Sequence, residues 1–323
     1  MYQTIDKAAA IPELRGIASA YYHEDGTLSE CILSEKNIIP TLYGDMIPRY
    51  GPEEVRKKYN HSISFYPGGA LKSMALEEQT EINTSLGTFP AELVTFYESG
   101  SVKRIFPLNG KITGYWTEAD EGQLCREYRF SFPFGSFKAK IISLCFYENG
   151  NLKALTLWPG ETIILKNKAD LYPVRIGFSL YEDGSLKSLE PAYDITLATP
   201  IGNLCAFDAD ALGMNAENNS LCFKKNGSIH SLKTSVSRIE VHNKNGNSVI
   251  MAPGVKPDPL EDDRSVILPL KITFEGSNAK FEGENPGVYP LSTTGFSVIN
   301  DDTAKDNRTF ACGDCSSCSL CGR

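Results

Sequence analysis

A hydrophobic pattern recurs along most of this chain. In each copy a bulky apolar residue stands four positions before a glycine, and a leucine, valine or isoleucine stands two positions after it. Aromatic and aliphatic residues favour strands, and the intervening Glu-Asn-Gly or Glu-Asp-Gly sequences favour tight turns. Each copy therefore predicts a β-hairpin. The six copies are Tyr22-Gly26-Leu28, Phe65-Gly69-Leu71, Phe96-Gly100-Val102, Phe146-Gly150-Leu152, Leu180-Gly184-Leu186 and Phe223-Gly227-Ile229.

A second, weaker pattern alternates with the first and supplies another set of glycines, Gly44, Gly87, Gly135 and Gly202. The distances from Gly26 to Gly44, from Gly69 to Gly87 and from Gly184 to Gly202 are all 18 residues. A repeated distance of this kind, with insertions in some copies, is typical of an elongated array in which each unit packs on its neighbours.

The aromatic-x-x-Asn/Asp-Gly-x-Leu-Lys pattern resembles the MORN-type family of short β-hairpin repeats, in particular the bacterial variants that read Phe-Tyr-x-x-Gly-x-Leu-Lys. The resemblance covers roughly residues 20 to 250. It implies an all-β fold: an elongated, twisted antiparallel meander of hairpin repeats, used for binding. It brings no catalytic residue with it.

The organisation that we predict has five parts. An N-terminal cap occupies residues 1–20 and the β-repeat domain occupies residues 21–250. A C-terminal β cap follows at 251–298, and it contains one strand-like stretch from Ser265 to Phe274. A polar, flexible tether is predicted at 299–311 and a Cys-rich tail at 312–323.

Short helical insertions are predicted between some repeats. Residues 51–60 have a proline at the first helical position, acids in the first turn and bases in the last, which favours a helix. Residues 208–214 are a second candidate insertion. Their Asp-x-Asp start resembles a calcium loop, but Leu212 and Asn219 stand where that loop needs an oxygen ligand and a glutamate, so a plain acidic loop is favoured.

Four tyrosines, Tyr66, Tyr97, Tyr147 and Tyr181, directly follow the buried residue of their repeat. Strand alternation places them on the opposite face, and Lys72, Lys103, Lys153 and Lys187 are predicted to lie on a solvated face. One interpretation is a partner-binding stripe; the equally weighted alternative is that this face packs on a second layer of the same protein. His23 and His230 fall at or beside the turns, where we expect exposed rings.

Composition narrows the class of protein. The chain has 32 basic and 40 acidic residues, a net charge of −8, which disfavours nucleic acid and anionic membranes as partners. It has neither an N-terminal signal pattern nor an apolar stretch of spanning length, so a cytoplasmic location is the expectation. Common enzyme motifs are missing from the sequence, and acid pairs such as Glu77-Glu78 are interpreted as surface charge.

Nine cysteines form two groups. Five are scattered through strand-like segments as Cys31, Cys125, Cys145, Cys205 and Cys222, where lone thiols usually act as small buried hydrophobes. The others, Cys312, Cys315, Cys318 and Cys321, stand at strict intervals of three. The first three resemble the Cys-x-x-Cys-x-x-Cys run of bacterial ferredoxins, which implies an iron-sulfur cluster, while zinc-thiolate binding and reversible disulfides are alternatives.

Three functional hypotheses follow. The first is a non-catalytic repeat scaffold that binds a protein or glycan partner and carries a metal-binding cysteine tail. The second is a metal or redox carrier that acts through the tail. The third is a hydrolytic enzyme on an all-β frame.

Overall fold

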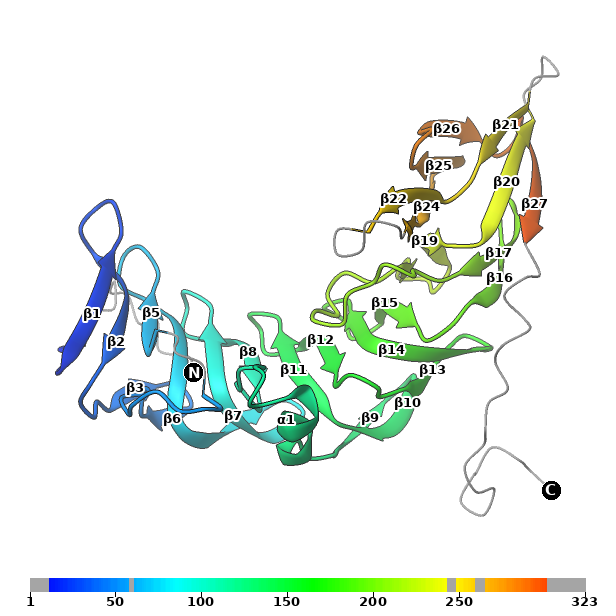
Figure 1. Ribbon diagram of the computed structural model, residues 1–323. Helices are drawn as coiled ribbons and strands as arrows, with labels where there is room; N and C mark the ends of the chain where they lie inside the picture. The colour runs from blue at the N-terminus through cyan, green and yellow to red at the C-terminus, as the bar shows by residue number, and fades with distance from the viewer. Residues whose placement is uncertain (1–11, 58–60, 243–247, 259–264, 301–323) are drawn as a thin grey trace, which may run out of the picture.

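The predicted all-β class is confirmed. The computed structural model describes residues 12–57, 61–242, 248–258 and 265–300, and it contains 56% strand and 3% helix. The molecule is a curved two-layer array, and its first strands and its last strands lie at opposite ends of the arc (Figure 1).

One long antiparallel sheet, the main sheet, runs through the whole array. Sixteen strands of the described residues belong to it, and neighbours in space are mostly neighbours in sequence. They are β1 (Ile17–Tyr22), β2 (Leu28–Leu33), β5 (Ile63–Phe65), β6 (Leu71–Thr84), β7 (Gly87–Phe96), β8 (Val102–Phe106), β11 (Ile141–Phe146), β12 (Leu152–Leu157), β13 (Ile163–Asn167), β14 (Asp170–Leu180), β15 (Leu186–Pro191), β18 (Leu221–Phe223), β19 (Ile229–Thr234), β24 (Leu270–Glu275), β25 (Asn278–Glu282) and β26 (Gly287–Pro290).

The six predicted hairpins are present, and their turns, which we call the main turns, are built alike. In each, the first residue donates its N–H to the carbonyl of the fifth residue and accepts a hydrogen bond from the N–H of the glycine at the fourth. That glycine has φ between 76° and 88° in all six turns. A register shift follows in each hairpin, as expected where a left-handed glycine forms a bulge. The main turns are residues 23–27, 66–70, 97–101, 147–151, 181–185 and 224–228.

A second layer consists of shorter hairpins that alternate with the main ones, as the spacing of 18 residues predicted. Three of its turns share a Thr-x-x-Gly sequence in which the threonine hydroxyl donates to the glycine carbonyl. The layer contains the outer halves of β6/β7 and β13/β14, and in addition β3 (Ile39–Thr41), β4 (Gly44–Met46), β9 (Tyr128–Phe132), β10 (Gly135–Ala139), β16 (Ile195–Thr199), β17 (Gly202–Ala206), β20 (Ser237–His242), β21 (Ser248–Met251) and β27 (Gly295–Asn300).

The two layers are tied together across distant parts of the chain. Ser85 Oγ donates to the carbonyl of Gly150 at 2.8 Å, and Asn167 Nδ2 donates to the carbonyl of Gly227 at 3.1 Å. The N–H of Val102 donates to the hydroxyl of Tyr43 at 2.9 Å. These three second-layer turns thus each bind a main turn, or the residue directly after it, about sixty residues further along the chain.

The hydrophobic core lies between the layers. It is continuous from Leu33 near one end to Phe281 near the other. In its middle, Phe132 and Phe134 of the second layer pack edge-on against Phe178 of the main sheet. In Figure 1 the second layer lies on the convex side of the arc, so the main sheet presents its other face to the concave side.

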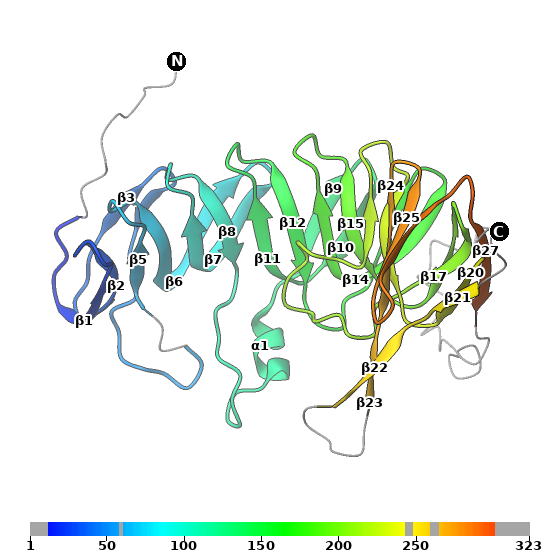
Figure 2. The same ribbon diagram turned by 90° about the horizontal axis from the view of Figure 1, so that it is seen from above.

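The helical prediction was only partly right. Residues 51–57 are not helical: Arg56 and Lys57 instead reach distant partners, and Lys57 forms a bridge with Gly110. Residues 208–214 form an irregular loop. The one helix of the described residues, α1 (Glu118–Leu124), starts with a capping box made by Thr117 and Asp120. The segment with α1 projects from the edge of the sheet opposite the main turns (Figure 2).

The stretch 265–274 is also more complex than one capping strand. Pro269 separates β23 (Ser265–Leu268), which pairs with β22 (Gly254–Pro257), from β24, which pairs with β19. Through β24, β25 and β26 the main sheet continues past residue 250. Within the described residues, no helix is long and apolar enough to cross a membrane.

Candidate functional site

The four predicted partner-binding tyrosines form a ladder along the main sheet. Each is half-buried, and its hydroxyl donates to a backbone carbonyl of the next main hairpin at 2.8 or 2.9 Å. His23, at the equivalent place in the first repeat, has Nε2 3.1 Å from the Phe65 carbonyl, so its ring is engaged rather than simply exposed. The carbonyls that accept from Tyr66, Tyr97, Tyr147 and Tyr181 belong to Phe96, Phe146, Leu180 and Phe223.

Each tyrosine ring also lies beneath a lysine of its own hairpin. The Nζ atoms lie 5.5 to 5.9 Å from the ring centroids, within the range of cation–π attraction. The pairs repeat at every main hairpin from the second to the fifth. We call them the Lys–Tyr sites: Lys72–Tyr66, Lys103–Tyr97, Lys153–Tyr147 and Lys187–Tyr181.

The ladder should contribute to stability one rung at a time. Tyr97→Phe and Tyr147→Phe are each expected to lower the free energy of unfolding by about 0.5–1.5 kcal/mol, because each removes one hydrogen bond between hairpins. Denaturant titration measures the loss. Tyr115→Phe is the control. Because Tyr115 is 92% exposed, loss of its hydroxyl should change the free energy of unfolding little. Equal effects at all three positions would contradict the ladder.

A single cross-strand row runs along the concave face of the main sheet. Its members are direct partners from one strand to the next, none of them belongs to the core cluster, and most are small. We call it the floor row: Tyr21, Glu30, Ser64, Ser73, Thr95, Arg104, Cys145, Ala154, Ser179, Ser188, Cys222, Ser231, Thr273, Lys280 and Val288.

One segment of the chain, residues 207–220, crosses this floor. The N–H of Ala216 donates to Thr156 Oγ1 at 3.2 Å, and Asn219 Nδ2 donates to Ser188 Oγ at 2.8 Å. Glu217 binds both Arg104 and Lys153, the latter at 2.7 Å. Burial raises the pKa of Glu217, but the two cations outweigh it and hold the pKa below its ordinary value, so the side chain is a carboxylate.

The same segment presents two bare apolar side chains. Leu212 is 82% exposed and Met214 is 80% exposed. With Tyr115 in the segment that carries α1, they are the three most exposed large hydrophobic side chains of the described residues. The sequence offered no periodic signal for them, because they belong to insertions and not to the repeats.

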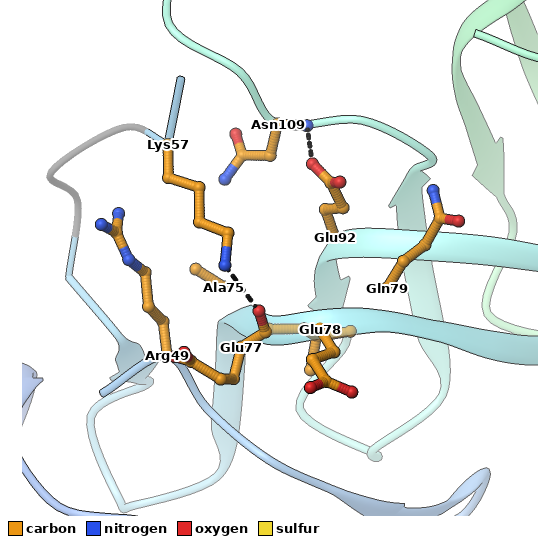
Figure 3. A pocket seen from close by; sticks show the side chains of 9 residues that line it. Arg49, Lys57, Ala75, Glu77, Glu78, Gln79, Glu92 and Asn109 are labelled. Atoms are coloured by element: carbon orange, nitrogen blue, oxygen red, sulfur yellow. Dashed lines mark hydrogen bonds between the residues drawn. The ribbon is translucent and has the colours of Figure 1, made fainter. Parts of the chain in front are cut away.

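A first pocket lies where β6 passes from the main sheet into the second layer (Figure 3). Its volume is about 220 Å³, and its charged groups are largely bonded to the protein. Glu77 Oε2 accepts from the N–H groups of Tyr50 and Gly51, while Lys57 Nζ donates to the Glu77 carbonyl at 2.8 Å. Burial raises the pKa of Glu77, but those N–H groups and Lys57 outweigh it and leave the pKa below its ordinary value.

A buried ionic cluster stands beside this pocket. Glu121 is 3% exposed, and Arg56 binds both of its oxygens, at 2.8 and 2.9 Å. Trp116 Nε1 and the N–H of Gly110 donate to the same carboxylate, and Arg56 also binds Glu92. The cluster therefore fastens the segment with α1 to the sheet.

A second pocket, of about 250 Å³, lies at the corresponding bend of β14. There Ile176 has φ 60°, which is strained for a β-branched residue. Lys233 Nζ binds the buried Asp208 at 2.7 Å, and Ser220 donates through its N–H and its hydroxyl to the buried Glu190, both at 2.8 Å. Burial is the main cause that raises the pKa of Glu190 to about 7, against the opposing effect of the Ser220 hydrogen bonds.

This buried carboxyl predicts a pH-dependent stability. Between its ordinary pKa of 4.5 and about 7, the folded chain keeps a proton that the unfolded chain releases. Stability should therefore fall by about 2–3 kcal/mol as the pH rises through that window. Urea unfolding at pH 4.5 and pH 8 measures the fall, and Glu190→Gln should remove most of it. The same pH dependence in the variant would rule out Glu190 as its source.

The structure describes only one of the two groups of cysteines. Cys31, Cys125 and Cys145 are buried, Cys205 and Cys222 are half-buried, and all five are free thiols. Burial raises the pKa of Cys31 to about 11, so it is an unreactive thiol. Cys312, Cys315, Cys318 and Cys321 lie outside the described residues. Among the residues that are described, no group of three His, Cys, Asp or Glu side chains is placed to hold a metal ion.

Comparison of the chain with protein-family models, with curated proteins and with solved structures found no match.

Proposed function

We propose that this chain is a non-catalytic repeat scaffold that holds a protein partner on its concave face. The observation that supports it best is the floor row, which extends over fifteen strands without an interruption in pairing. Residues 207–220 cover the centre of the row, but Ser73 and Thr95 lie outside the covered stretch and are only half-buried, so a partner's backbone can approach the sheet closely there. Concave surfaces of this kind are the usual binding faces of repeat arrays.

The rigidity of the concave face also supports the proposal. The tyrosine ladder and the contacts between layers hold successive hairpins at fixed positions, so little ordering entropy is lost when a partner binds. In contrast, Glu77, Glu190 and Asp208, which line the two pockets, already have protein partners.

A matched pair of double variants tests the face. Ser73 and Thr95 are half-buried cross-strand partners on the floor row, and Ser131 and Ser136 are exposed cross-strand partners on the second layer. Each pair is changed to arginine. The two variants and the unchanged chain are each used to capture proteins from a lysate of the source cells. Quantitative mass spectrometry then compares the captured proteins. Ser73→Arg with Thr95→Arg should abolish binding of the specific partner, and Ser131→Arg with Ser136→Arg should not. Equal retention by both variants would contradict the proposal.

We propose in addition that the tail binds a metal through Cys312, Cys315, Cys318 and Cys321. Four thiols at intervals of three suit either an iron-sulfur cluster or tetrahedral zinc. Protein purified anaerobically is analysed for iron, sulfide and zinc beside a variant with all four cysteines changed to serine. The unchanged chain should carry metal and the variant should lack it, with the same unfolding midpoint because the array does not depend on the tail. Metal-free protein in both samples would exclude the site in favour of disulfides or an inert tail.

A further inference from the structure

We infer that the Lys–Tyr sites are a row of carboxylate sites for an extended acidic segment of the partner, and that Glu217 already occupies one of them. The inference rests on the proposed scaffold function and identifies which chemistry the concave face recognises.

The four sites are built alike, and at Tyr181 a second lysine, Lys225, also lies over the ring, at 5.7 Å. In each, the lysine directly follows the apolar residue after the turn glycine, and the tyrosine is the first residue of the main turn. Its ring lies under the lysine, and its hydroxyl is used by the next hairpin. A lysine held in this way keeps its ammonium group near the surface and ready to meet an anion.

At one site the chain itself shows the mode of binding. Lys153 Nζ donates to Glu217 Oε1 at 2.7 Å while it stays 5.9 Å from the Tyr147 ring centroid. Beside Glu217, Ala216 lies fully buried against the floor and its N–H binds Thr156. The concave face thus already binds a small residue buried against the floor row, followed by a residue whose carboxylate pairs with the lysine.

The other three sites have no such occupant. Among the described residues, no carboxylate forms an ion pair with Lys72, Lys103 or Lys187. Each of these lysines contacts a tyrosine ring instead. Lys72 and Lys103 are exposed and Lys187 is half-exposed. Glu98, Glu148 and Glu182 lie near Tyr66, Tyr97 and Tyr147, so each of these sites also has an acidic neighbour that weakens its attraction for an anion.

The spacing of the sites defines the partner further. Successive sites are two strands apart in the main sheet, on β6, β8, β12 and β15. Two strand spacings are about 9.5 Å. A polyproline II segment advances about 9.3 Å in three residues and returns to the same face, so acidic residues at every third position would meet successive lysines. The geometry therefore fits an extended segment with a glutamate or aspartate at every third residue, running across the strands from Lys72 on β6 to Lys103 on β8, where it meets the Lys153 site that Glu217 already occupies.

Fluorescence anisotropy with labelled synthetic peptides tests this directly. The probe is a peptide of Glu-Ala-Pro repeats, and its controls are Gln-Ala-Pro repeats and a scrambled peptide of the same composition. The full chain is compared with Lys72→Gln, Lys103→Gln and Lys187→Gln combined. Its matched control combines Lys36→Gln, Lys138→Gln and Lys166→Gln, three exposed lysines outside the floor row with the same change in charge. All variants are first checked for an unchanged unfolding midpoint.

The triple variant of the Lys–Tyr sites should bind the Glu-Ala-Pro peptide about tenfold more weakly, because the partly exposed ion pairs at these sites each contribute a few-fold. The matched control should bind as the unchanged chain does. Equal binding by both triple variants, equal binding of the glutamine or scrambled peptide, or no binding at all would overturn the inference. Partner capture that depends on Ser73 and Thr95 would still stand in that case, so failure here is distinct from failure of the scaffold proposal.

Discussion

Gly177→Ala is expected to destabilise the fold by about 4 kcal/mol or more, enough to prevent accumulation of soluble protein. Gly177 has φ 139°, and a Cβ there would lie 2.0 Å from the Leu155 carbonyl oxygen and 2.8 Å from the Ala216 Cβ. Since Gly177 is paired with Thr156 across β12 and β14, the clash would force the two strands apart in the middle of the main sheet. Chemical denaturation measures the loss, or soluble yield if the variant does not fold.

Gly150→Ala is the matched control for this prediction. Its φ is 84°, but a Cβ would meet nothing within 4 Å, so only backbone strain of about 1 kcal/mol is expected. A Gly177→Ala variant that is as stable as Gly150→Ala would show that β12 and β14 do not approach as described.

Glu121→Ala is expected to cost about 3 kcal/mol or more. Removing one partner of a buried ion pair destabilises the charge that remains. Here Arg56 would keep only Glu92, and Trp116 Nε1 and the Gly110 N–H would lose their acceptor. Because this cluster fastens the segment with α1, hydrogen exchange should accelerate in residues 107–127 before the rest of the array. Unfolding curves and exchange mass spectrometry give the two readouts.

Glu118→Ala, in the first turn of the same helix, is the control. Glu118 is exposed, so its loss should cost less than about 1 kcal/mol through the helix dipole alone. If Glu121→Ala and Glu118→Ala had equal effects, the buried cluster would not be what holds this segment.

The hairpins were predictable because their decisive residues are local. A glycine that must adopt positive φ, with apolar residues at fixed distances on both sides, specifies a main turn without any information from the rest of the chain. The same dependence on glycine explains why one second-layer turn was not predicted. The second-layer turn at Asn167–Asp170 has Asp170 at the position where its counterparts have glycine, and its positive φ, 56°, lies at Lys168 instead, so the glycine pattern did not predict it.

The functional side chains were less predictable because their partners are distant. Nothing in the local sequence of Tyr97 shows that its hydroxyl binds the Phe146 carbonyl, or that Glu217 lies on Lys153. The helix expected at 51–60 failed for the same reason: its charges suit a helix, but in the structure Arg56 is bound by Glu121, 65 residues away. Thr117 and Asp120 do carry a local helix signal, a capping box, but it lies in an insertion outside the repeat pattern.

The proposed binding face requires the main sheet to be one continuous array, and cleavage of the chain at its middle tests this most directly. A specific protease site is inserted after Gly114, in the projecting segment, and the nicked protein is analysed by size exclusion under native conditions. The two fragments should elute together as one folded particle, because β8 pairs with β11 through Ile105 and Leu144, which are both buried in the shared core. Two fragments that elute separately, each folded by circular dichroism, would contradict the account.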